Sequence, residues 1–187
     1  IIVDKKYYLR KDSEEFQRPI KKNILKDFNN NLSSYDALIF SDYAKGFLDR
    51  QLFNSLKNIA IKKGIPIFVD PSVKNIFNFE NVTYFKPNLN ESIYISSKKN
   101  IKQVLDALSK MYNTIPVVTL GSEGSVSLDN SKVIYSKKYK TNVVDASGSG
   151  DIFFAYFIDS ILSNNSLQSS LDVASMKASK NVEFFGF

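Results

Sequence analysis

The chain has 187 residues, of which 43% are hydrophobic and 24% are charged, with a formal net charge of +6. This composition predicts one globular domain with a real core, and no apolar run is long enough to span a bilayer. Cysteine and histidine are both absent, which excludes thiol catalysis, disulfides, Ser-His triads and Cys or His metal sites. Proton transfer must therefore use Asp, Glu, Lys or Tyr, and a bound metal would be a hard cation such as Mg²⁺.

Apolar runs alternate with helical patterns along the chain. We expect strands at 1–9, 37–40, 65–69, 82–85, 115–120 and 143–144, the 37–40 strand being buried, and a hairpin at 125–136. We expect helices at 49–63, 101–112, 152–162 and 167–184, and a further helix beginning at 89. This alternation predicts right-handed βαβ units and a mainly parallel sheet. The fold class is therefore α/β.

Polar or glycine residues follow the expected strands at their carboxyl ends. They are Ser41, Asp42, Asp70, Asn88, Thr119, Gly121 and Asp145. Ligand sites of parallel sheets lie beyond these ends, so we expect a site at this edge. The lysines are spread along the chain without a basic patch, so we expect no nucleic-acid partner.

The segment 142–151 reads N-V-V-D-A-S-G-S-G-D and carries the strongest functional signal. A glycine-rich turn that opens a helix presents N–H groups to an anion. A carboxylate beside an anion site suits a base that deprotonates a group attacking that anion, which indicates phosphoryl transfer with Asp151 as base. The alternative is a tight turn in which Asp151 only caps the helix.

Three further segments have a chemical and a structural interpretation each. Asn88 and Glu91 offer amide and carboxylate oxygens for Mg²⁺, or form a capping box. The segment 119–124 permits close approach of a phosphate or a flat ring, or is simply a turn. Lys45 could reach the site as a mobile charge, or is a solvated loop lysine. Neither a Walker A loop nor a Rossmann fingerprint is present.

Together these motifs resemble the ribokinase-like, or PfkB, carbohydrate kinases. The segment 145–151 is similar to that family's second signature, with Ala146 in place of the usual threonine, and 88–91 matches its N-x-x-E metal motif. The segment 118–124 resembles the strand and turn beside the nucleotide. The resemblance implies a mainly parallel central sheet flanked by helices on both faces. Residues 1–187 would be one incomplete kinase domain, its C-terminal, nucleotide-binding portion.

The resemblance also implies roles for individual residues, with ATP and Mg²⁺ as cofactors. Asp151 would be the base, and the N–H groups of 147–150, including Gly148, Ser149 and Gly150, would hold the phosphoryl charge. Glu91 and Asn88 would hold Mg²⁺ through water. Residues next to the nucleotide would be Thr119, Gly121, Gly124, Asn88 and Lys45.

The segments 40–46, 69–71 and 86–91 resemble the heptose-7-phosphate kinases of lipopolysaccharide precursor synthesis. The implied reaction is phosphorylation of D-glycero-D-manno-heptose 7-phosphate at its anomeric hydroxyl, in the cytoplasm and away from membranes. Both chain ends suggest a fragment, and the full protein is expected to be fused to an adenylyltransferase. A homodimer, a kinase for another sugar or nucleoside, and a nucleotide-binding module without catalysis stay open.

Overall fold

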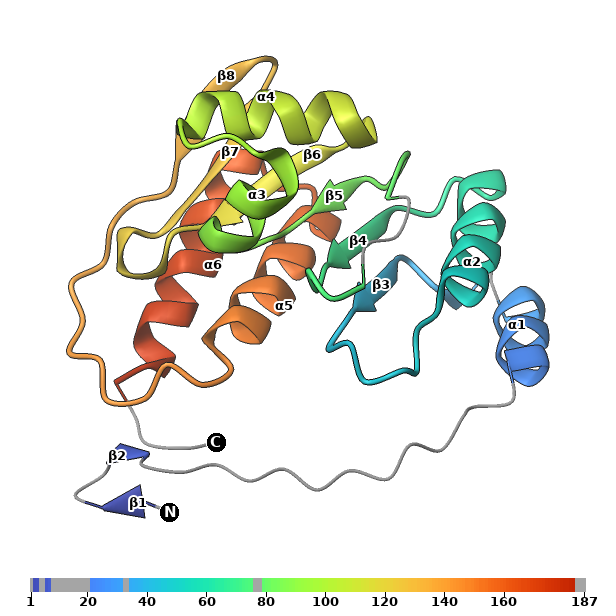
Figure 1. Cartoon of the computed structure of the whole chain (residues 1–187), viewed down its shortest axis with the longest axis horizontal. Helices are drawn as coiled ribbons and strands as arrows, with labels where there is room; N and C mark the ends of the chain where they lie inside the picture. Colours follow the sequence, from blue (N-terminus) through green and yellow to red (C-terminus); the bar gives the residue numbers. More distant parts are fainter. Residues whose placement is uncertain (1, 4–5, 8–20, 32–33, 76–78, 184–187) are drawn as a thin grey trace.

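The computed structural model describes residues 2–3, 6–7, 21–31, 34–75 and 79–183. At the centre of this part of the chain lies one mixed sheet with the strand order β3-β4-β5-β6-β7-β8 (Figure 1). Strands β3 to β6 are parallel, and β7 and β8 are antiparallel to their neighbours. The strands are β3 (Leu38–Ser41), β4 (Ile67–Asp70), β5 (Tyr84–Phe85), β6 (Ile115–Thr119), β7 (Ser125–Asp129) and β8 (Lys132–Tyr135).

Helices cover both faces of this sheet (Figure 1). Residues of α1 (Lys21–Asn30), α2 (Arg50–Lys62), α3 (Leu89–Ser96) and α4 (Ile101–Tyr112) pack into one apolar core. Residues of α5 (Ser149–Leu162) and α6 (Leu167–Asn181) pack into a second core. The expected α/β architecture with helices on both faces is confirmed.

Alternation along the strands divides the apolar side chains between the two cores. In β4, Ile67 and Val69 face the core with α2 and α4, whereas Phe68 faces α5 and α6. In β6, Val118 faces the core with α2 and α4, and Val117 faces α5 and α6. A parallel strand buried on both faces therefore reads as a continuous apolar run, which is why these strands were predictable.

Several expected elements differ from the observed ones. Residues 143–144 form no strand, because the Val144 N–H donates to the Val182 carbonyl and both valine side chains are exposed. Helix α5 begins at Ser149, earlier than expected, and α6 ends at Asn181. Of the strand expected at 1–9, the described residues form two short antiparallel strands, β1 (Ile2–Val3) and β2 (Lys6–Tyr7).

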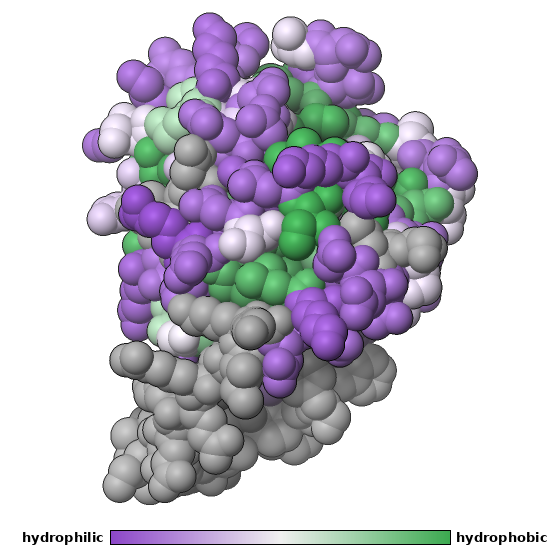
Figure 2. All heavy atoms as spheres, turned by 90° about the vertical axis from the view of Figure 1, so that its right-hand side faces the viewer, coloured by the Kyte–Doolittle hydropathy of each residue, from purple (hydrophilic) through white to green (hydrophobic). Residues whose placement is uncertain are grey.

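The expectation that the strand at 37–40 is buried was wrong. Among the described residues β3 is the edge strand of the sheet and pairs only with β4. Ile39 is 49% exposed, and Phe40 is the one buried residue of β3. Figure 2 views the side of the molecule that carries α1 and α2, and hydrophobic surface is visible there among polar side chains.

Helix α1 was missed because lysines and asparagines surround its short apolar stripe of Ile24, Leu25 and Phe28. These three side chains pack against the core that also contains α2. None of the helices in the described ranges is both long and apolar enough to cross a membrane.

Candidate functional site

The candidate site lies where the parallel strands end. Asp70 is the last residue of β4, Lys86 directly follows β5, and Thr119 ends β6. The Asp42 N–H bonds to the Asp70 carbonyl at 3.0 Å, which joins the loop after β3 to the same edge. The strand register therefore brings together groups that lie far apart in the sequence.

The glycine turn before α5 presents backbone donors to this edge. Gly148 adopts a left-handed conformation with φ +72° and precedes the first helical residue, Ser149. The Ser147 N–H donates to Asp145 Oδ1 at 2.9 Å, and the Ser149 N–H donates to the Ala146 carbonyl at 3.3 Å. Both N–H groups were expected to hold a phosphoryl group, but in the structure each is bonded within the turn. Within the described residues, the N–H groups of Gly148 and Gly150 donate to no protein acceptor. Together with the helix dipole, these two groups are able to hold an anion, which makes this turn the candidate anion-binding position.

The end of α6 holds this turn in place. Val182 accepts hydrogen bonds from the N–H groups of Val144 and Asp145, at 2.7 and 3.1 Å. Asp145 is only 9% exposed and uses its carboxylate inside the turn. Asp145 is therefore structural, whereas the exposed Asp151 is available for chemistry.

Asp151 lies in the first turn of α5 and receives a hydrogen bond from a distant loop. The Tyr43 hydroxyl donates to Asp151 Oδ1 at 2.7 Å. This hydrogen bond is the largest cause of a raised pKa for Tyr43. Tyr43 therefore remains a neutral donor at physiological pH. Sequence reasoning missed this contact, because the two residues are 108 positions apart.

A buried ion pair lies beside the glycine turn. Lys86 Nζ is 2.9 Å from Asp70 Oδ2, and the two side chains are 5% and 20% exposed. The ammonium also lies 5.3 Å from the ring centroid of Phe154. A Cβ added to Gly150 would lie 4.0 Å from Lys86 Nζ. The ammonium is therefore close to the anion-binding position, although the sequence analysis gave Lys86 no role.

The carboxylates of this edge influence one another. Burial raises the pKa of Asp70 to about 6, and Lys86 opposes this shift. The charges of Glu91 and Asp151 raise the pKa of Asp70 further. The charges of three carboxylates therefore act together at this edge, and the Lys86 ammonium pairs with one of them, Asp70. An oxygen-rich edge with this charge suits a hydrated Mg²⁺ that bridges to phosphate.

Asn88 and Glu91 form the capping box that was the alternative to a metal site. Asn88 Oδ1 accepts from the Glu91 N–H at 2.9 Å, and Glu91 Oε2 accepts from the Asn88 N–H at 2.8 Å. In the described ranges, no group of three or more acidic side chains is close enough to enclose a metal ion directly. A Mg²⁺ here would keep most of its waters, and the metal role of both residues stays a prediction.

A cavity of about 190 Å³ opens next to the glycine turn. Its lining includes Thr119, Gly121 and Gly124, together with Ser149 and Gly150. The structure thus brings three residues assigned to the nucleotide together with the turn assigned to its phosphates. Lining residues that sequence reasoning did not assign are Ser122, Tyr139, Thr141, Val143, Ala146, Phe153, Ser175, Ala178, Ser179 and Val182.

Serines from three elements support the cavity floor. The Ser175 hydroxyl donates to Ser136 Oγ at 2.9 Å, and Ser136 Oγ also accepts from the Ser125 N–H at 2.9 Å. Gly124 lies against Ser136, so a larger residue would disturb this network. The helical spacing of Ser175 and Ser179 in α6 was the available signal, but serine spacing alone does not reveal a cavity.

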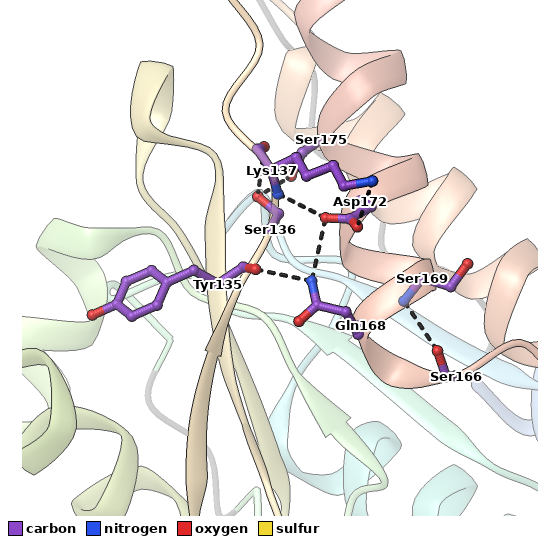
Figure 3. A network of polar contacts seen from close by, with 8 residues as sticks. All are labelled: Tyr135, Ser136, Lys137, Ser166, Gln168, Ser169, Asp172 and Ser175. Carbon is purple, nitrogen blue, oxygen red and sulfur yellow. Dashed lines mark hydrogen bonds and ion pairs between the residues drawn. The ribbon is translucent and has the colours of Figure 1, made fainter.

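Polar contacts also tie the end of β8 to α6 (Figure 3). Gln168 Nε2 donates to the Tyr135 carbonyl at 2.9 Å and lies 3.3 Å from Asp172 Oδ1. The Lys137 N–H donates to the same Asp172 oxygen at 2.6 Å. These contacts hold the segment after β8 against α6, and that segment continues into one wall of the cavity.

Lys45 lies in the loop after β3, and its side chain is exposed. It is not among the residues that line the cavity. Its assignment to a phosphate stays a prediction, whereas Lys86 is the ammonium that the fold places next to Gly150.

Comparisons with known proteins agree with this geometry. The family described as "pfkB family carbohydrate kinase" matches residues 6–186. Among curated proteins, the bifunctional protein HldE of Sulfurimonas denitrificans is 28% identical over 177 residues, covering 91% of this chain and 37% of that protein. HldE of Helicobacter pylori is 27% identical over 187 residues, covering 95% of this chain and 40% of that protein. The chain thus spans about two fifths of the length of these relatives.

Solved structures share the fold. Arabidopsis thaliana ribokinase complexed with ribose and ATP superposes with a TM-score of 0.71 at 21% identity, covering 88% of this chain and 54% of the ribokinase. Escherichia coli phosphofructokinase-2 in complex with potassium gives a TM-score of 0.76 at 17% identity, covering 88% of this chain and 57% of the phosphofructokinase. The expected ribokinase-like fold is confirmed.

Replacing Gly124 by alanine should disturb the cavity floor. Gly124 has φ +85°, which L residues rarely adopt, and the added Cβ would collide with Ser136 Oγ. We expect Gly124→Ala to lower the free energy of unfolding by about 1–3 kcal/mol, measured by urea denaturation, and to weaken ATP binding. Gly64→Ala is the matched control, because Gly64 has φ +70° with open space around it. Equal losses in both variants would contradict the packing role of Gly124.

The raised pKa of Asp70 predicts a pH-dependent stability. Between the ordinary value of 3.8 and about 6, the folded protein binds more protons at Asp70 than the unfolded chain does. The contribution of Asp70 to the free energy of unfolding is therefore greatest below pH 3.8 and is lost as the pH rises through about 6. We expect the free energy of unfolding of wild type minus that of Asp70→Asn to fall between pH 4.5 and 7. Urea denaturation across this range measures the difference.

The matched control for this measurement is Asp106→Asn. Asp106 forms a surface ion pair with Lys102 on α4, where solvent screens the charges. A difference between wild type and Asp70→Asn that stays constant across the pH range would contradict the prediction.

Proposed function

Since this chain belongs to the pfkB family of carbohydrate kinases, we propose that it takes part in transferring the γ-phosphate of ATP to a sugar hydroxyl. The observation that supports this most directly is the first turn of α5. There the N–H groups of Gly148 and Gly150 donate to no acceptor among the described residues, Gly150 lines the cavity, and Asp151 lies in the same turn. An anion site next to a base is the arrangement that phosphoryl transfer to a hydroxyl requires.

In the proposed reaction Asp151 accepts the proton of the attacking sugar hydroxyl. The hydroxyl oxygen forms a bond to the γ-phosphorus while the bond from that phosphorus to the β–γ bridging oxygen breaks, and ADP leaves with the electron pair. The N–H groups of Gly148 and Gly150 stabilise the charge on the transferring group. Lys86 supplies the nearest buried positive charge.

Glu91 and Asn88 would hold Mg²⁺ through water. When bound, the ion neutralises β- and γ-phosphate oxygens. The nucleotide would occupy the cavity bordered by Thr119, Gly121 and Gly124. Because ATP is the phosphate donor, we assign the reaction to the cytoplasm.

For the acceptor we propose D-glycero-D-manno-heptose 7-phosphate, phosphorylated at its anomeric hydroxyl. The support is the resemblance of 40–46, 69–71 and 86–91 to heptose-7-phosphate kinases, and the similarity to bifunctional proteins named HldE. In the full-length protein we propose a fused adenylyltransferase half, as in the heptose kinases that the chain resembles.

A substrate panel tests the acceptor. The protein encoded by the whole gene is assayed by coupled ADP detection with the heptose 7-phosphate, fructose 6-phosphate, ribose and adenosine. We expect the highest kcat/KM for the heptose phosphate, at least tenfold above the others. Preference for another sugar would overturn the substrate but not the kinase. ATP binding without turnover of any acceptor would instead indicate a nucleotide-binding module.

Replacing Asp151 by asparagine tests the base. We expect kcat to fall by about 10²–10⁴-fold, since general base catalysis contributes this much, while the ATP dissociation constant from calorimetry stays within about twofold. Asp159→Asn on the exposed side of α5 is the matched control and should leave kcat unchanged. Wild-type turnover by Asp151→Asn would remove Asp151 from its proposed role.

A further inference from the structure

Tyr43 is the residue at this site whose contact is not explained by the proposed function. Its hydroxyl bonds to Asp151 Oδ1 at 2.7 Å, although its side chain is 61% exposed. An exposed tyrosine gains little from burial, so its position must come from its own loop and from the carboxylate that it contacts.

The loop around Tyr43 is held by its own polar contacts. Asp42 Oδ1 accepts from the Ala44 N–H at 2.8 Å and from Asn75 Nδ2 at 3.2 Å. Ala44 adopts a left-handed conformation with φ +55°, which is unfavourable for a residue with a Cβ. Because the Asp42 N–H also bonds to the Asp70 carbonyl, the loop is attached to the strand end beside the ion pair. These contacts hold the start of the loop, where Tyr43 lies, in one shape.

The Asp151 carboxylate has few other constraints. It is exposed, and among the described residues Tyr43 supplies the hydrogen bond that its side chain accepts. A carboxylate on a helix surface rotates freely unless one oxygen is held. With Oδ1 bonded to Tyr43, Oδ2 is the oxygen that remains to take a proton.

We propose that Tyr43 is a positioning residue for the base, fixing the Asp151 carboxylate so that Oδ2 faces the incoming sugar hydroxyl. This inference rests on the proposed function and adds to it the loop after β3 as part of the machinery. In the transfer step the sugar hydroxyl gives its proton to Oδ2, and Tyr43 keeps its own proton throughout. Tyr43 therefore acts through Asp151 and does not itself exchange a proton.

A double-mutant cycle measures this coupling in the protein encoded by the whole gene. The variants are Tyr43→Phe, Asp151→Asn and the double variant, assayed with ATP and the acceptor that the wild type phosphorylates best. Tyr43→Phe should lower kcat about tenfold, the effect of one hydrogen bond to a charged group, with the KM for ATP unchanged. When Asp151 is already replaced by asparagine, Tyr43→Phe should lower kcat no further.

Tyr94→Phe is the matched control, because Tyr94 is 63% exposed on α3. It should leave kcat unchanged. Calorimetric titration with ATP checks that every variant is folded.

Each other outcome contradicts the inference in a distinct way. An unchanged kcat in Tyr43→Phe, with Asp151→Asn inactive, overturns the positioning role and leaves the proposed function standing. An equal loss in both backgrounds shows that Tyr43 acts on the substrate and not through Asp151, which also overturns it. Full activity of Asp151→Asn, or turnover of no acceptor by the wild type, overturns the proposed function and the inference together.

Discussion

The buried ion pair between Lys86 and Asp70 is the interaction on which the rest of the candidate site depends. Removing one partner of such a pair leaves an uncompensated buried charge and costs about 3–5 kcal/mol. The parallel register pairs Val69 with Phe85, so Asp70 and Lys86, which follow them, lie side by side at the carboxyl edge of the sheet. The register of β4 and β5 therefore determines where Asp70 and Lys86 pair. That pair in turn holds the Lys86 ammonium close to Gly150 in the first turn of α5.

The charge balance at this edge supports the proposal of a metal ion there. The charges of Glu91 and Asp151 act on Asp70, which pairs with the buried Lys86 ammonium. A nucleotide would add several further negative charges, so the edge needs a mobile cation before a polyphosphate can approach it. The formal net charge of +6 does not meet this need, because the lysines are spread along the chain. The proposed Mg²⁺, which Glu91 and Asn88 would hold through water, would supply this positive charge locally.

The sequence predicted the elements whose patterns are local. Helix α4 was predicted with its observed bounds, because its apolar spacing is regular and Asn100 caps it. The glycine turn and Asp151 were identifiable from one short segment. The ion pair and the contact between Tyr43 and Asp151 were not, because each joins residues whose proximity depends on strand order. The serines of the cavity floor come from β7, the end of β8 and α6, and none of these segments carries a distinguishing pattern alone.

Ala146 shows how a departure from the family signature can be tolerated. The threonine common at this position would add a hydroxyl, but the turn is closed without one. The Ala146 carbonyl accepts from Ser149 Oγ at 2.9 Å, and the Asp145 carboxylate accepts from the Ser147 N–H. Both bonds use groups that any residue at 146 would leave in place. Ala146 instead lines the cavity, so the difference from threonine falls on the wall of the proposed nucleotide site and not on the two hydrogen bonds that close the turn.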